Sequence, residues 1–155
     1  TAMKTRLKQI RGIATFIRSN ERKYKPNTSL LLGDLNYGGE NIITRTETFT
    51  LEPSSEYEKV TDIFERKCMS PIDVFRSLHP IRPRMSYDEA GLTYDSVINA
   101  DSDGEPKRLD YCYMFIHGYG CLKPISANIL LQRKIGTRTK FLSDHFPISV
   151  VFKIQ

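Results

Sequence analysis

Helical and strand periodicities alternate along this chain, and their order limits the architectures open to it. Apolar side chains recur at helical spacing from Leu7 to Ile17, which predicts an amphipathic helix over residues 3–19. The short apolar run 30–32 ends at Gly33 and is typical of a buried strand. Further helices are expected over 57–69 and 71–78, further strands over 92–97, 109–116, 128–132 and 148–154, and irregular segments over 36–55, 79–91 and 99–106. The sequence therefore predicts an α/β fold in which helices cover a mixed sheet.

Basic charge is concentrated in the first 25 residues, which hold eight Lys or Arg side chains against one acid, Glu21. The whole chain has a formal charge of +5, so the remainder is slightly acidic. A surface that follows a nucleic-acid backbone usually draws Lys and Arg from several parts of a chain, which makes a nucleic-acid partner less expected here. Two interpretations of the basic segment stay open: a solvated helix face, or peripheral contact with an anionic membrane surface.

The three cysteines, Cys68, Cys112 and Cys121, include no close pair. A disulfide framework or a structural zinc site is therefore not expected. Cys112 lies in an apolar strand pattern and is expected to be a small buried hydrophobe.

Asp34 and Asn36 follow directly after the apolar run 30–32 and the turn-forming Gly33. Both side chains are therefore expected at the end of a strand, where α/β sheets commonly bind ligands. A carboxylate and an amide two residues apart can hold a metal-bound water and a phosphate oxygen together. An Asx-type turn is the competing interpretation of the same residues.

Asp110 lies inside the strand expected over 109–116, on the face that it shares with Cys112 and Met114. A carboxylate beside such apolar neighbours is costly unless it has a partner. Its natural partner is a histidine, because the carboxylate fixes one ring nitrogen and leaves the other for acid–base chemistry. The alternative is a salt bridge to Arg108 or to another structural arginine.

Two other short motifs contribute candidate polar groups. Asp144 and His145 precede the last strand, and imidazole is the side chain best suited to exchange protons near neutral pH. The adjacent carboxylate of Asp144 can orient a nucleophile or bind a divalent cation. Thr93 can donate a hydrogen bond to a buried carboxylate or to a phosphate.

Taken in order, these motifs resemble those of the endonuclease/exonuclease/phosphatase superfamily, the DNase I-like proteins. The motifs are Gly33-Asp34-Leu35-Asn36, Thr93-Tyr94-Asp95, Arg108-Leu109-Asp110-Tyr111 and Ser143-Asp144-His145-Phe146-Pro147. The run from Asp73 to Pro80, the stretch Gly91–Asp95, and Asn99 look most like neutral sphingomyelinases. Inositol polyphosphate 5-phosphatases instead have Trp-x-Asp-Arg at the third motif, and this chain has no Trp.

The resemblance implies Mg²⁺-dependent hydrolysis of a phosphodiester lipid, sphingomyelin, to ceramide and phosphocholine. It makes His145 the general base and Asp110 the group that orients it. It also implies that Asp34 and Asn36 bind the water and the scissile phosphate, that Asp144 and Asp34 are metal ligands, and that Asn36 and Thr93 contact substrate. His79 and His117 match no catalytic position and are expected to be structural or exposed. A nuclease, an inositol polyphosphate 5-phosphatase and a truncated, non-catalytic binding module remain alternatives.

The resemblance covers the C-terminal half of such a domain, which as a whole is a four-layer α/β sandwich. Residues 1–155 are therefore expected to form half of that sandwich. The N-terminal half, with the principal glutamate ligand of the metal, is expected to come from another polypeptide. An apolar sheet face that this second polypeptide covers is a further expectation.

Overall fold

The computed structural model describes residues 2–45, 48–67, 69–99, 104–119, 122–130 and 143–155. Its helices are α1 (Ala2–Tyr24), α2 (Ser55–Glu65), α3 (Val74–Leu78) and α4 (Tyr87–Ala90). Its strands are β1 (Thr28–Asp34), β2 (Glu40–Arg45), β3 (Phe49–Pro53), β4 (Pro71–Asp73), β5 (Asp110–Ile116), β6 (Leu122–Ile129) and β7 (Ile148–Ile154). No helix in these ranges combines the length and the apolar character needed to cross a membrane.

The central sheet has the strand order β1-β5-β4, and two smaller sheets pair β2 with β3 and β6 with β7. Every pairing among the described strands is antiparallel, so the expected mixed sheet is wrong. The reason lies in where the chain re-enters the sheet: β5 begins at Asp110 opposite the end of β1 at Asp34 and runs back along it. The coarser expectation, an α/β fold with helices against sheet, is confirmed.

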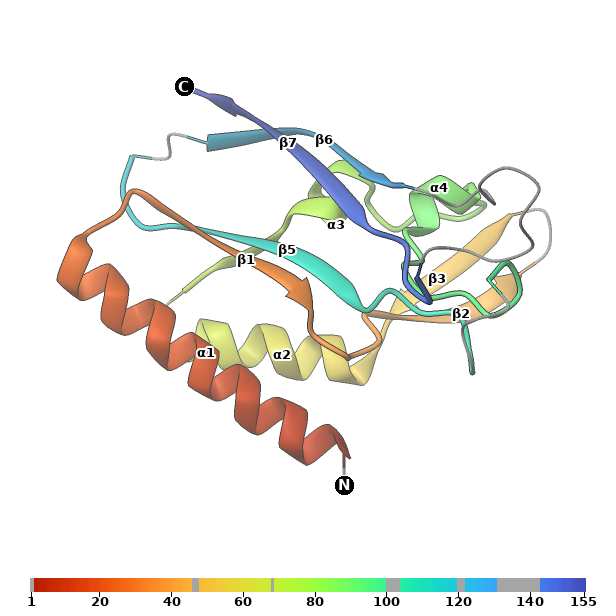
Figure 1. Cartoon of the computed structure of the whole chain (residues 1–155), viewed down its shortest axis with the longest axis horizontal. Helices are drawn as coiled ribbons and strands as arrows, with labels where there is room; N and C mark the ends of the chain where they lie inside the picture. Colours follow the sequence, from red (N-terminus) through yellow and green to blue (C-terminus); the bar gives the residue numbers. More distant parts are fainter. Residues whose placement is uncertain (1, 46–47, 68, 100–103, 120–121, 131–142) are drawn as a thin grey trace.

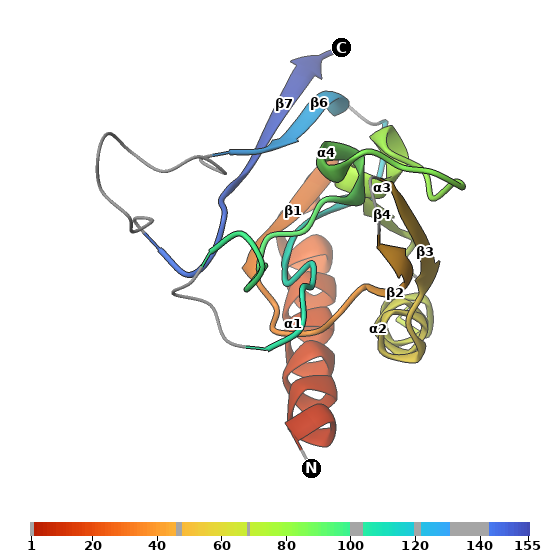
Figure 2. The ribbon, with the colours of Figure 1, turned by 90° about the vertical axis from the view of Figure 1, so that its right-hand side faces the viewer.

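The elements lie in three layers, and the central sheet is the middle layer (Figures 1 and 2). Helices α1 and α2 cover one face, and β6, β7 and α3 lie against the other. The expected alternation along β5 is confirmed, because its residues divide between two apolar clusters. Tyr111, Tyr113 and Phe115 pack with Ile10 and Ala14 of α1 and with Val60 and Phe64 of α2. Cys112 and Met114 pack with Val74 of α3 and with Val150 and Phe152 of β7.

The expected long helices are present with shifted ends. Helix α1 extends beyond the predicted residues 3–19 at both ends. Helix α2 begins two residues early because Ser54 caps it by accepting a hydrogen bond from Tyr57 N. It ends at Glu65, earlier than predicted, and Cys68 lies outside the described residues. The segment predicted as a helix over 71–78 begins instead as the short strand β4 before α3 starts.

The polar segments were predicted less well than the apolar ones. Residues 36–55, expected to be a loop, contain the β2–β3 hairpin, whose Phe49 and Leu51 are buried against Met85 and Leu92. Thr and Ile fit a pleated strand even where polar neighbours hide the alternation. Residues 92–97, expected to be a strand, form only one isolated bridge, Tyr94 to Lys107. Strand β6 covers the first part of the strand expected over 128–132, and residues 131–132 lie outside the described ranges.

A buried ion network joins segments that are distant in sequence. The Arg108 guanidinium has no exposed surface and bonds Asp73 (3.1 and 2.7 Å) and Glu40 (3.2 and 2.7 Å). Arg76 bonds Glu40 at 2.7 Å and also donates to the carbonyl oxygens of Glu89 and Ala90. The network therefore ties the hairpin, β4, α3 and the segment before β5 into one unit.

A Glu40→Gln variant should have a lower free energy of unfolding than the wild type, mainly above pH 5. Burial raises the pKa of Glu40, but Arg108 and Arg76 outweigh it and lower the pKa to about 2. Because the folded-state pKa is depressed, this stabilisation is present above the unfolded pKa of about 4.3 and is lost as pH falls toward 2. In urea unfolding, the difference in free energy of unfolding between wild type and variant should decrease by on the order of 3 kcal/mol as the pH falls from about 5 toward 2. A difference that does not change with pH would contradict the ionised network.

Candidate active site

Two of the predicted site residues, Asp34 and Asp110, face each other across the β1–β5 pair. They are direct partners in the antiparallel register, at the end of β1 and the beginning of β5. Gly33, which precedes Asp34, has φ +136°, a conformation that side-chain-bearing residues rarely adopt. The antiparallel register of β1 and β5 therefore places one carboxylate beside the other at the same end of the two strands.

His145 completes this pair of carboxylates. Its Nδ1 lies 2.8 Å from Asp110 Oδ2, and both side chains are about one-fifth exposed, at 22% and 18%. The expected contact between Asp110 and a histidine is therefore confirmed. The alternative salt bridge to Arg108 is wrong, because the Arg108 guanidinium turns instead to Glu40 and Asp73.

Asn36 lies next to Asp34 and closes a turn with it. The Asn36 backbone N–H donates to Asp34 Oδ1 at 2.7 Å, and Asn36 Nδ2 donates to Asp34 Oδ2 at 3.0 Å. Asn36 has φ +54°, which asparagine tolerates better than most residues. The Asx-type turn is thus present, and it orients the Asp34 carboxylate beside Asp110.

Asp144 is exposed and precedes His145 in the loop before β7. Ser143 Oγ donates to Asp144 Oδ1 at 3.3 Å and accepts from the His145 backbone N–H at 3.1 Å. The negative charge of Asp144 helps to raise the pKa of His145. Asp144 does not belong to the group of candidate metal donors, which is Asp34, Asp110 and His145. Its expected metal contact stays a prediction.

The pKa of His145 is set by opposing influences. Partial burial lowers it, but the hydrogen bond to Asp110 and the charges of Asp110, Asp34 and Asp144 raise it, and the net shift is upward. Protonated His145 therefore stabilises the fold below its unfolded pKa of about 6.5, and that contribution is lost as pH rises through the raised folded pKa. A role as proton acceptor requires a pH above that raised value.

Thr93 holds the first residues of β5 in place. Its side chain is fully buried, and Oγ1 accepts hydrogen bonds from the backbone N–H groups of Leu109 (2.9 Å) and Asp110 (3.1 Å). The Thr93 carbonyl accepts from Phe146 N at 2.7 Å. The residue thus connects the segment that bears Asp110 with the loop that bears His145. This is a positioning contact, and the expected contact of Thr93 with substrate stays a prediction.

Asn99 and Tyr94 support the same loop from the same segment. Asn99 is fully buried, and its Nδ2 donates to the Ser143 carbonyl at 2.6 Å. The Tyr94 ring meets the His145 ring edge-on, with centroids 5.2 Å apart. The sequence pattern gave Tyr94 no separate role, and its only signal was its place beside Thr93.

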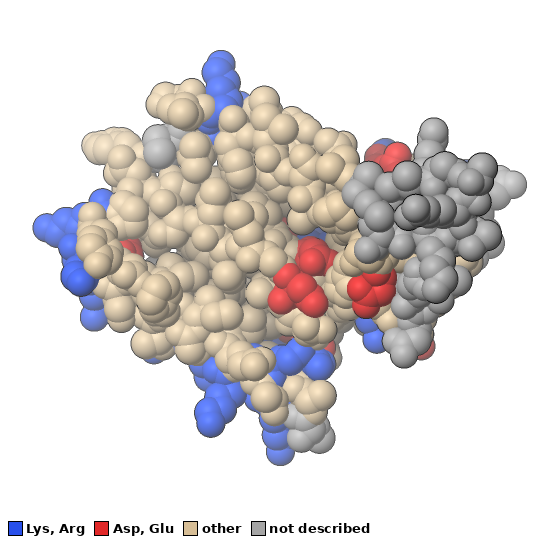
Figure 3. Space-filling view, viewed as in Figure 1, with Lys and Arg blue, Asp and Glu red and all other residues tan. Residues whose placement is uncertain are grey.

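The donor set at this edge suits a divalent cation. Asp34, Asp110 and His145 each offer one ligand atom, and these atoms all lie within 4.8 Å of one another. Mg²⁺ prefers carboxylate oxygens, and Asp34 is the more exposed of the two carboxylates. Figure 3 shows acidic side chains gathered over the end of β1 and the start of β5, beside a broad uncharged area. The residues present therefore fit a magnesium ion held chiefly by carboxylate.

The other two histidines lie elsewhere and make structural contacts. His79 Nε2 is 2.9 Å from the Ala127 carbonyl oxygen, and the ring packs against Phe75. His117 Nε2 is 2.9 Å from Ser29 Oγ, beyond the far end of β5 from Asp110. Both positions agree with the structural role expected of them.

Apolar side chains are exposed on the strands beside this cluster. Leu30 and Leu32 of β1 are 38% and 60% exposed, and Ile125 of β6 and Val151 of β7 are also exposed. Leu30 and Leu32 pair with Met114 and Cys112, so they lie on the face that also bears Asp34. An apolar row on β1 therefore ends at the acidic cluster.

Comparison of the chain with protein-family models, with curated proteins and with solved structures finds no match.

Proposed function

We propose that this chain forms the catalytic segment of a Mg²⁺-dependent phosphodiesterase similar to the neutral sphingomyelinases. The observation that supports it most is the hydrogen bond between Asp110 and His145 beside Asp34 at one sheet edge. A buried structural carboxylate would need only a cation, as Asp73 has in Arg108. A paired histidine next to a second, exposed carboxylate is the arrangement that general-base catalysis uses.

Each residue has a defined role in the proposal. The Asp110 carboxylate accepts a hydrogen bond from His145 Nδ1–H, which leaves Nε2 unprotonated and able to take a proton from water. Asp34 and Asn36, at the end of β1, position that water and the scissile phosphate. A magnesium ion held by Asp34, with Asp144 beside it, would offset the charge that builds on the phosphoryl oxygens. Thr93 keeps Asp110 in register with the loop of His145.

A further polypeptide segment is part of the proposal. Asp34, with Asp144 beside it, supplies fewer donors than a six-coordinate magnesium ion takes, and waters or further carboxylates fill the remaining positions. The exposed row Leu30 and Leu32 leads to Asp34, so a segment that packs on this row would reach the metal donors. We assign to that segment an apolar contact face and one additional carboxylate ligand.

The proposed substrate is a choline phosphodiester lipid. An enzyme that includes residues 1–155 should release phosphocholine from sphingomyelin liposomes faster than it nicks supercoiled DNA, at equal enzyme concentration and physiological salt with Mg²⁺. Two points favour the lipid: the resemblance of Asp73–Pro80 and Gly91–Asp95 to sphingomyelinases, and the slight acidity of the chain beyond residue 25.

Parallel assays on the two substrates distinguish the outcomes. DNA nicking without phosphocholine release would reject the lipid substrate and favour a nuclease with the same site. Absence of both activities in an enzyme that binds Mg²⁺ would favour a non-catalytic binding module. A His145→Ala enzyme serves as the control for contaminating hydrolases.

A further inference from the structure

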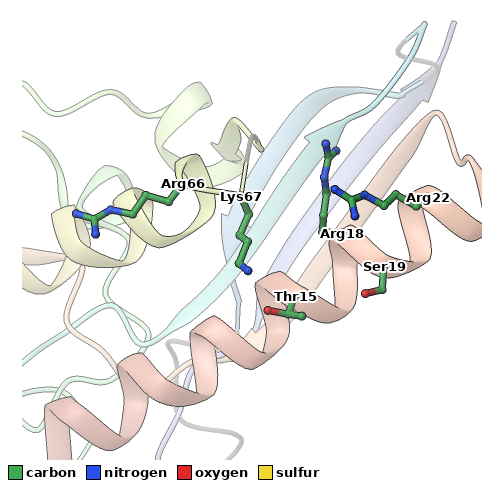
Figure 4. A pocket seen from close by; sticks show the side chains of 6 residues that line it. All are labelled: Thr15, Arg18, Ser19, Arg22, Arg66 and Lys67. Carbon is green, nitrogen blue, oxygen red and sulfur yellow. The ribbon is translucent and has the colours of Figure 1, made fainter.

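A second polar site lies in the helical layer, on the opposite face of the central sheet from Asp34 and Asp110. It is a pocket of about 250 Å³ between the second half of α1 and the end of α2 (Figure 4). Its lining contains four basic side chains and two hydroxyls: Thr15, Arg18, Ser19, Arg22, Arg66 and Lys67. This site has no part in the proposed hydrolysis.

The spacing of the α1 residues explains why they meet. Thr15, Ser19 and Arg22 are four and three residues apart, and such residues lie on one face of a helix. Lys67 follows the end of α2, and Figure 4 shows it extending toward α1, whereas Arg66 points away. The packing of α1 on α2 therefore brings cations from two elements to one pocket.

The charges in the pocket are only partly neutralised. Glu21 pairs with Arg18, and Asp62 pairs with Arg66. Within the described ranges, no hydrogen bond or ion pair engages the side chains of Arg22 and Lys67. Two like charges facing one small pocket repel each other, and a bound anion would relieve that repulsion.

We propose that this pocket binds a phosphate group. The planar guanidinium of Arg22 can donate two parallel hydrogen bonds to phosphate oxygens, the ammonium of Lys67 adds a point charge, and Ser19 adds a hydroxyl donor. The volume is below the range usual for whole small-molecule ligands, so a single phosphate group is the part that it encloses. Free phosphate esters and the headgroup of an anionic lipid both present this chemistry.

The test compares two double variants of the full 155-residue chain. Arg22→Gln/Lys67→Gln removes the two unpaired cations, and Lys4→Gln/Lys8→Gln removes the same charge from exposed positions near the start of α1. One probe is inorganic phosphate, followed by calorimetry at low salt. The other is sedimentation with phosphatidylcholine vesicles that contain or lack phosphatidic acid. All four substituted side chains are exposed, so both variants should fold like the wild type.

Saturable phosphate binding should weaken by about tenfold or more in Arg22→Gln/Lys67→Gln and by less than about twofold in Lys4→Gln/Lys8→Gln. If Arg22→Gln/Lys67→Gln also binds phosphatidic acid vesicles more weakly than Lys4→Gln/Lys8→Gln does, and free phosphate competes with the vesicles, the natural ligand is a lipid headgroup. If the two variants differ only in their binding of inorganic phosphate, the natural ligand is a soluble phosphate ester. Equal weakening in the two variants, or no saturable binding of either probe by the wild type, would overturn the proposal. None of these measurements depends on hydrolysis.

Discussion

A His145→Ala enzyme is expected to lose roughly 10²- to 10⁴-fold in phosphodiester turnover with little change in substrate binding. This is the usual contribution of a positioned acid–base group. Asp110→Asn should also lower turnover, because a neutral amide holds the Nδ1–H tautomer of His145 less well than the carboxylate does. The measurement is initial phosphocholine release at saturating substrate and Mg²⁺.

The double variant Asp110→Asn/His145→Ala sharpens this experiment. If Asp110 acts through His145, the double variant should be no slower than His145→Ala alone. Additive losses would mean that the two side chains act separately, against the contact at 2.8 Å. His117→Gln is the matched control, since His117 follows β5 at the end opposite Asp110 and should retain wild-type turnover. Wild-type turnover in His145→Ala would remove the residue from the mechanism.

An Arg108→Met variant is expected to lose about 3–5 kcal/mol of folding free energy. Arg108 is the shared cation of Glu40 and Asp73, whose side chains are only 5% and 4% exposed. Removal of the guanidinium leaves two carboxylates buried with one fewer partner, although Arg76 still bonds Glu40. Urea denaturation at pH 7 provides the free energy of unfolding.

Two further variants keep this prediction testable if Arg108→Met does not fold. Arg108→Met/Glu40→Gln/Asp73→Asn removes all three charges together and should recover part of the loss. Arg66→Met removes a surface arginine whose side chain is 77% exposed and should change stability by less than about 0.5 kcal/mol. A loss below about 1 kcal/mol in Arg108→Met would show that the network is not a main source of stability.

The position of Asp110 was predictable because two local patterns agreed. Strand alternation placed it on the face of Cys112 and Met114, and the cost of burying an unpaired carboxylate required a partner. The structure supplies His145 from 35 residues away. The amphipathic pattern of α1 was equally informative, since burial of Ile10 and Ala14 follows directly from helical spacing.

The ion network around Arg108 was not predictable by the same means. Its partner Glu40 lies 68 residues away, in a polar segment that resembled a loop. No local periodicity marks an ion pair between segments that only the fold brings together. The same limit applies to the strand directions: the pairing of β1 with β5 depends on the path of about 75 intervening residues, and the alternation within each strand is the same for either direction.

Residues 92–97 were expected to form a strand, and residues from 99 onward an irregular segment. In the structure, Thr93 and Asn99 instead use their polar groups to hold Asp110 and Ser143. Burial of such groups is tolerated because each has its hydrogen-bond partner. The segment therefore acts as a polar support beneath the candidate site.

The central claim is that Asp34 binds a divalent cation beside the hydrogen-bonded pair of Asp110 and His145. Titration of the isotope-labelled protein with Mn²⁺, followed by paramagnetic broadening of its NMR signals, tests this claim most directly. Broadening should begin at residues 34–36, 110 and 144–146, reverse with excess Mg²⁺ and disappear in Asp34→Asn/Asp110→Asn. Glu58→Gln/Glu65→Gln, which removes two exposed carboxylates from α2, should leave it unchanged. Broadening that begins elsewhere, or that persists in Asp34→Asn/Asp110→Asn, would contradict the claim.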